Sequence, residues 1–133
     1  MSEPPSQRHV LVTGAGGAVG QPVCRHLVGR GHTVRGFGLE SHPDLPDSVV
    51  GDLTDADAVG RAAHGMDTVI HLAAYPNPAD FIDVLLGPNV IGLHHVCQAA
   101  LDQGVRRLVL ASTLQVTSGL PRDRVVRVAD GVA

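Results

Sequence analysis

The feature that most constrains the fold is a glycine-rich segment, residues 13–20 (TGAGGAVG), which lies between two apolar segments of different character. Residues 9–13 are short and β-branched, which is typical of a fully buried strand. An apolar stripe over residues 23–28 indicates a helix that ends near Gly31. A strand, a glycine turn and a helix in this order predict the start of a parallel α/β sheet.

The same alternation continues along the chain. Further strands are predicted at residues 32–37, 48–50, 67–72 and 106–112, and further helices at 54–65 and 80–104. We expect Thr54 or Asp55 to cap the first of these helices, and an interruption with a kink near Gly87-Pro88 in the second. Right-handed crossovers then predict a doubly wound parallel sheet of the Rossmann type, order 3-2-1-4-5, truncated after about five strands.

Composition excludes several classes of partner. The net charge is −3 and the only aromatic residues are two Phe and one Tyr, so a nucleic-acid partner is not expected. The first seven residues are polar and Pro-rich, and Cys24 and Cys97 read as reduced thiols, so we expect a cytoplasmic protein with no membrane partner. Eight histidines lack the spacing of metal ligands, and no metal site is predicted.

The glycine segment favours a pair of phosphates. Backbone N–H groups and the helix dipole both attract anions at the start of a helix that follows a glycine turn. In such a turn Gly14 permits the sharp bend, Gly17 allows close approach of phosphates, and Gly20 allows the helix to pack closely. A turn with no ligand remains the alternative for the motif alone, but its strand–turn–helix context favours a dinucleotide.

These residues resemble the extended short-chain dehydrogenase/reductase family, also called the NAD-dependent epimerase/dehydratase family. The resemblance rests on the glycine spacing and on four further stretches in the family's order, GDL at 51–53, HLAA at 71–74, NVIG at 89–92 and LVLAST at 108–113. It implies a dinucleotide-binding domain over residues 9–118. Residues 1–8 are then expected to form a disordered tail, and residues 119–133 a loop leading to an absent C-terminal portion.

The resemblance also implies roles for single residues. Asp52 is expected to hydrogen-bond the adenine amino group, and Thr113, or Ser112 one residue away, is expected to hydrogen-bond the substrate oxygen. The other implied cofactor-binding residues are Gly14, Gly17, Ala18, Val19, Gly20, Leu53, Leu72, Ala73, Ala74 and Asn89. Taken singly, Asp52 could be a helix cap, Asn89 a side chain that satisfies the kink, and Ser112-Thr113 an ordinary strand end.

The sequence departs from the family in its catalytic pair. The family uses Tyr-x-x-x-Lys beyond the position of Thr113, whereas all ten basic residues of this chain are arginines and its single tyrosine is Tyr75. We interpret the chain as a fragment of a longer enzyme and expect Tyr-x-x-x-Lys to be encoded soon after Ala133. A naturally truncated nucleotide-binding module is the other interpretation.

Cofactor choice is also open. The acidic residue that holds the ribose of NAD usually ends the second strand, where this chain has Gly38, with Glu40 two residues on. We expect NAD, with NADP not excluded. The resulting hypothesis is an oxidoreductase or epimerase that transfers hydride between the cofactor and a sugar, sugar-nucleotide or uronate-like substrate. A homo-oligomer is compatible with this hypothesis. The alternative hypothesis is a regulatory nucleotide-binding module of the same fold. Turnover by a chain extended past Ala133 would distinguish them.

Overall fold

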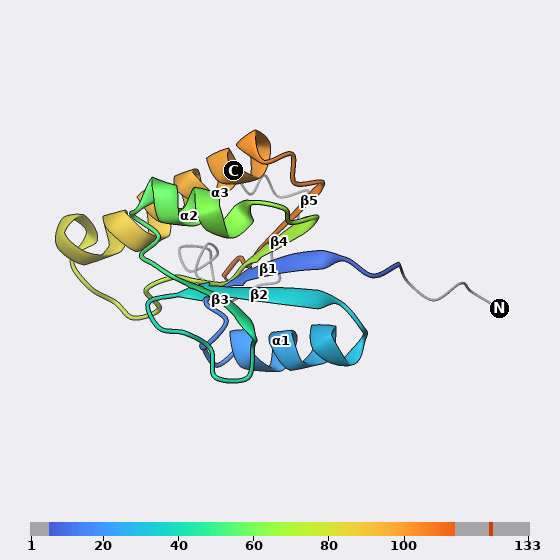
Figure 1. The fold of residues 1–133 in the computed structure, drawn as a ribbon. Coiled ribbons are helices and arrows are strands. Elements are labelled where there is room, and N and C mark those ends of the chain that lie inside the picture. The colour runs from blue at the N-terminus through green and yellow to red at the C-terminus, as the bar shows by residue number, and fades with distance from the viewer. Residues whose placement is uncertain (1–5, 114–122, 124–133) are drawn as a thin grey trace.

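The computed structural model describes residues 6–113 and 123, and its centre is a parallel five-stranded sheet in the order β3-β2-β1-β4-β5 (Figure 1). The strands are β1 (His9–Thr13), β2 (Thr33–Gly38), β3 (Asp47–Val50), β4 (Thr68–His71) and β5 (Arg107–Leu110). The helices are α1 (Gly20–Gly29), α2 (Ala56–Ala63), η1 (Phe81–Ile91) and α3 (Gly92–Asp102). The predicted fold class and strand order are therefore confirmed.

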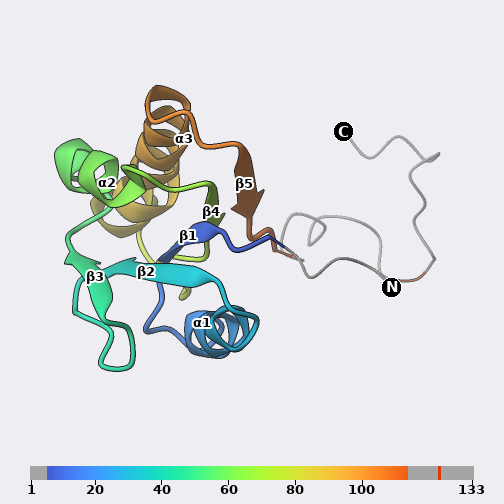
Figure 2. The same cartoon turned by 45° about the vertical axis from the view of Figure 1, so that its right-hand side comes forward.

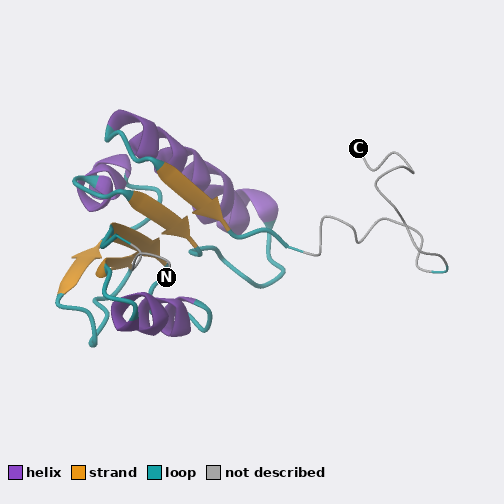
Figure 3. Ribbon diagram, turned by 90° about the vertical axis from the view of Figure 1, so that its right-hand side faces the viewer, coloured by secondary structure: helices purple, strands orange, loops and turns teal. Residues whose placement is uncertain are grey.

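Helices cover both faces of the sheet. Helix α1 lies on one face, and α2, η1 and α3 lie on the other (Figures 2 and 3). Strand β1 is buried on both sides, with Val10 and Val12 in the cluster that includes Cys24 of α1, and Leu11 in the cluster that includes Val59 of α2. Alternate side chains of a strand point to opposite faces, so an aliphatic run of this kind supplies both cores.

The ends of the helices follow local chemistry. Gly31, Gly65 and Gly104 have positive φ angles, between 67° and 83°, and each follows a helix that ends two residues earlier. Asp55 caps α2, because its Oδ1 accepts a hydrogen bond from the Ala58 N–H at 3.0 Å. Of the two caps considered for this helix, Asp55 is therefore the one that the structure uses.

The segment around Pro88 stays helical but is wound more widely than an α-helix. The N–H of Leu85 donates to the carbonyl of Asp80, five residues back, at 3.1 Å, and the N–H of Gly92 donates to the carbonyl of Gly87. η1 then continues directly into α3. The expected interruption therefore takes the form of π-helical turns, which accommodate the missing N–H of Pro88 without a gap in the helix.

Within the described residues, Phe81–Asp102 is the one helical stretch long and apolar enough to cross a membrane by length and composition. Its second half packs inside the protein: Val96 and Ala99 are buried, and Gly92 lies so close to Leu53 that a Cβ there would be 2.6 Å from the leucine Cβ. The apolar composition of α3 is thus explained by its place on the sheet.

The ordered structure begins before His9. The N–H of Arg8 donates to His32 Nδ1 at 3.3 Å, and the N–H of Thr33 donates to the Arg8 carbonyl at 2.9 Å. Arg8, which the sequence placed in the tail, is thus hydrogen-bonded beside the start of β2. Residues 1–5 and most of the predicted segment 119–133 lie outside the described residues.

Candidate functional site

A cavity of about 550 Å³ lies at the carboxyl ends of β1, β2, β3 and β4. The crevice at this edge of a doubly wound sheet is where ligands bind. Four segments at the strand ends and one residue of η1, Pro88, meet there. They contribute Gly14, Gly16 and Gly17; Phe37, Gly38, Leu39 and Glu40; Gly51, Asp52, Leu53 and Thr54; and Ala73, Ala74, Tyr75 and Pro88.

The glycine turn approaches its surroundings too closely for side chains. Gly14 has φ +70°, and a Cβ there would lie 2.8 Å from the Ala73 backbone nitrogen. A Cβ on Gly20 would overlap the Gly14 carbonyl oxygen and lie 2.8 Å from the Ala15 Cα. The positive φ of Gly14 confirms its predicted role in the bend. Gly20 packs closely against the turn, at Gly14 and Ala15, and its expected role in packing the helix against a strand stays a prediction. The role of Gly17 toward phosphate stays a prediction; a Cβ there would meet only the Gly14 oxygen, at 3.3 Å.

The start of α1 has no side-chain cap. Its N-cap residue, Val19, provides no hydrogen-bonding side chain, and the first turn contains no acidic residue. Helices normally satisfy their first N–H groups with a capping oxygen. In the first turn of α1 the Gln21 N–H donates to the Gly17 carbonyl oxygen at 3.0 Å and Pro22 has no N–H, so an anion in the adjoining cavity would meet the N–H groups of Gly20 and of the glycine turn before it.

A buried hydrogen-bond cluster joins β1 to β4 behind the glycine turn. The Thr13 Oγ1 lies 2.7 Å from His71 Nδ1 and accepts from the N–H groups of Leu72 and Ala73, each at 3.2 Å. Burial lowers the pKa of His71, so the ring is neutral near pH 7. The cluster ties Gly14 to the loop after β4.

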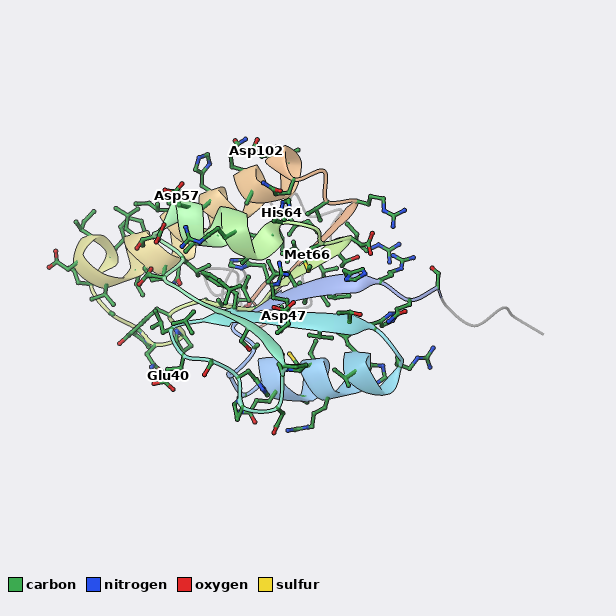
Figure 4. All side chains as sticks on the ribbon, viewed as in Figure 1. Glu40, Asp47, Asp57, His64, Met66 and Asp102 are labelled. Carbon is green, nitrogen blue, oxygen red and sulfur yellow. The ribbon has the colours of Figure 1, made fainter. Side chains whose placement is uncertain are left out.

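The β2 and β3 ends supply the acidic part of the cavity. Figure 4 shows Glu40 on the loop after β2, well separated from Asp57 and Asp102 on the α2 and α3 side. Asp52 Oδ1 accepts from both the N–H and the hydroxyl of Thr54, each at 2.8 Å, and these hydrogen bonds hold the pKa of Asp52 below its ordinary value. Asp52 is thus ionised and caps a turn, while the cap of α2 is Asp55.

Among the residues that the structure describes, the lining includes two acids and no arginine. The 2′-phosphate of NADP would therefore meet like charges and no cation. The 2′- and 3′-hydroxyls of the NAD ribose could instead donate hydrogen bonds to a carboxylate. The cavity consequently favours NAD over NADP on electrostatic grounds.

Not all sequence-predicted residues reach the cavity. Ala18 and Val19 are exposed in the turn before α1, and Leu72 packs against the core on the α1 face. Asn89 does not line the cavity but is hydrogen-bonded to Tyr75, which does. Ser112 and Thr113 follow β5 at the same edge of the sheet and are exposed outside the cavity. Their catalytic roles, like the other contacts to cofactor, stay predictions.

Sequence reasoning missed the Thr13–His71 pair and the contribution of Tyr75, Thr54 and Pro88 to the cavity. A polar residue inside each of two predicted buried strands was a signal for the pair, because buried polar groups in a core need partners.

In the described part of the chain no group of three or more His, Cys, Asp or Glu side chains could hold a metal ion. A second hollow, of about 600 Å³, lies on the outer side of α2 and α3.

The fold and the site define an α/β protein with a Rossmann-type nucleotide crevice. Residues 10–125 match the NAD dependent epimerase/dehydratase family, and the chain belongs to this family. The resemblance inferred from the glycine spacing is thus confirmed.

Individual relatives share the same region. A 2-alkyl-3-oxoalkanoate reductase of Stenotrophomonas maltophilia is 41% identical over 112 residues, which cover 81% of this chain and 34% of the relative. A uronate dehydrogenase of Pseudomonas syringae is 33% identical, with 80% and 40% covered. A crystal structure of a short-chain dehydrogenase/reductase superfamily protein from Agrobacterium tumefaciens with bound NAD is 39% identical with a TM-score of 0.76, covering 81% of this chain and 33% of that one. This chain therefore spans about a third of the length of several relatives that it matches.

Proposed function

We propose that this chain binds NAD in the crevice between α1 and the β2, β3 and β4 ends, as the cofactor-binding part of an oxidoreductase. The observation that carries the proposal is the uncapped N-terminus of α1 beside a cavity lined by Gly14, Gly16 and Gly17. Paired phosphates would accept from the N–H groups of Gly20 and of the glycine turn before it, since the Gln21 N–H is bonded to Gly17, and would interact with the helix dipole.

The remaining lining fits the rest of the nucleotide. Glu40 and Asp52 stand where the adenosine half would lie, since the acid that binds its ribose follows β2 in folds of this kind. Leu53 is buried with one side on the cavity and offers an apolar contact for a base. This chain would thus hold and orient the cofactor, and the bound nicotinamide ring would supply the hydride chemistry.

The substrate proposed is a hydroxyl compound related to sugars, sugar nucleotides or uronates. Support comes from a uronate dehydrogenase and an NAD-dependent glucose-6-phosphate dehydrogenase among the relatives, the latter 40% identical over 112 residues. Thr113, or Ser112 beside it, is proposed to hydrogen-bond the substrate oxygen. The chain has no lysine, so the family's Tyr–Lys proton exchange requires residues outside it.

A second candidate is a nucleotide-binding module of the same fold without turnover. Calorimetric titration of the chain with NAD and with NADP tests the common part of both proposals. We expect saturable binding with at least about tenfold preference for NAD; equal or tighter binding of NADP would contradict the assignment of Glu40 and Asp52. NADH formation by a version extended past Ala133, with sugars and uronates as substrates, would support the enzyme. Binding without turnover in any length would support the module.

A further inference from the structure

Asn89 makes two hydrogen bonds to the main chain of a single residue across the connection between β4 and η1. Its Oδ1 accepts from the Tyr75 N–H at 2.7 Å, and its Nδ2 donates to the Tyr75 carbonyl oxygen at 3.1 Å. A side-chain amide can pair both polar groups of a residue in this way, as a neighbouring strand would. Residues 72–80 contain no helix or strand, so this pair fixes the backbone where regular structure does not.

The wide turns of η1 place Asn89 for this contact. The residue follows Pro88, which lines the cavity and has no N–H of its own to donate. A π-helical turn holds more residues than an α-helical one, so it rotates the following side chains about the axis relative to α-helical spacing. Here the result is an amide directed at the loop after β4.

Tyr75 connects this contact to the cavity, because its backbone bonds Asn89 and the residue also lines the cavity. It is 42% exposed and lines the cavity together with Pro88, in the same hollow as Asp52 and Leu53. We propose that Asn89 is a positioning residue that acts through Tyr75: its amide holds the loop so that the tyrosine forms one wall of the adenosine part of the crevice. The inference rests on the proposed nucleotide binding and replaces direct contact between Asn89 and the cofactor.

A double-mutant cycle tests this path. ADP is the probe, because it carries the adenosine and paired phosphates without the nicotinamide half. We expect Asn89→Ala and Tyr75→Ala each to weaken ADP binding about fivefold by calorimetry, and the double variant to bind no more weakly than the weaker single variant. Losses that multiply in the double variant would show that Asn89 contacts ADP independently, and would overturn the inference.

A second measurement needs no ligand. Hydrogen exchange at the Tyr75 amide is expected to become faster in Asn89→Ala, and less so in Asn89→Asp, which keeps an acceptor oxygen for that N–H but loses the donor to the Tyr75 carbonyl oxygen. Gln98→Ala is the control, because its amide bonds Asp102 on α3 outside the cavity, at 2.8 Å. It should change neither exchange at Tyr75 nor ADP affinity. Unchanged Tyr75 exchange in Asn89→Ala would contradict the positioning role.

The two proposals fail in different ways. If the unaltered chain does not bind ADP or NAD, the proposed function is wrong and the role of Asn89 falls with it. If the unaltered chain binds ADP and the losses in the cycle multiply, only the role of Asn89 is wrong.

Discussion

The N-termini of α1 and α2 lie at the same edge of the sheet but end in different ways. Helix α2 is closed by its own chemistry, with the Asp55 carboxylate on the Ala58 N–H and Asp57 in the first turn. Helix α1 begins after Val19 with neither a capping side chain nor an acid. A side chain of the protein therefore caps the helix that lies away from the cavity, whereas the helix that begins beside the cavity has no side-chain cap.

The same contrast holds for the glycines of the two helices. Gly20, which opens α1, is packed against Gly14 and Ala15, whereas Gly60 inside α2 has no atom within 4 Å of the place of a Cβ. One glycine is required by geometry, and the other is a residue that alanine could replace.

The largest expected effect is therefore that of Gly20→Ala. Its new Cβ would overlap the Gly14 carbonyl, so the turn or α1 must shift, and we expect the unfolding free energy to fall by about 3 kcal/mol. Urea unfolding gives the value. Gly60→Ala is the matched control and should gain about 0.5–1 kcal/mol from helix propensity. Equal losses in both variants would remove the distinction between the two glycines.

The next effect is on binding. Gly17→Val should weaken NAD binding at least about tenfold, because a branched side chain would occupy the approach of the phosphates. Its stability should change less than that of Gly20→Ala, since the Cβ would meet only the Gly14 oxygen at 3.3 Å. Calorimetry measures the affinity, and Gly29→Ala, at the far end of α1 with nothing within 4 Å, is the control. Unchanged affinity in Gly17→Val would break the assignment of the turn to phosphate.

Removing the cap of α2 should lower the stability of the protein and leave its affinity for NAD unchanged. Asp55→Ala leaves the Ala58 N–H without its acceptor, and we expect a loss of about 1 kcal/mol in unfolding free energy. NAD affinity should stay the same, because Asp55 does not line the cavity. A fall in affinity as large as that in Gly17→Val would mean that the start of α2 also serves the ligand.

A pH-dependent effect concerns His71, behind the turn. Burial lowers its folded-state pKa from 6.5, so below about pH 6.5 the unfolded chain binds a proton that the folded chain does not. The unfolding free energy should therefore decrease as the pH falls from about 6.5 toward the folded pKa, by at most about 1.4 kcal/mol per pH unit. The lowered pKa values of Asp52 and Asp67 act separately, near and below their ordinary value of 3.8.

Urea unfolding across this range checks the assignment to His71. His71→Asn should flatten the dependence between pH 5 and pH 6.5, whereas His94→Asn, outside the Thr13 cluster, should keep it. A slope that survives in His71→Asn would assign the dependence to another group.

Local patterns were sufficient to predict the sheet and the helix ends. The strand order followed from the alternation of elements, and the stops at Gly31, Gly65 and Gly104 followed from glycine at those places. The positions of Gly14 and Gly20 were likewise predicted, because a motif of short range determines them. In these regions the residues that act together are neighbours in the sequence.

The parts that escaped prediction depend on partners far along the chain. Thr13 meets His71 across 58 residues, and Asn89 meets Tyr75 across 14. Neither contact has a local pattern, since each needs the finished sheet to bring its partners together. The wide turns around Pro88 are similar: the sequence indicated a disturbance there, but not that the helix continues through π-helical turns into α3.

The most direct test of the account is a titration of the chain with NAD, followed by the chemical shifts of its backbone amides. We expect the largest changes at Gly16 to Gly20, at the uncapped start of α1, and little change at Ala58, at the capped start of α2. Changes centred on α2, or no changes at saturating NAD, would contradict it.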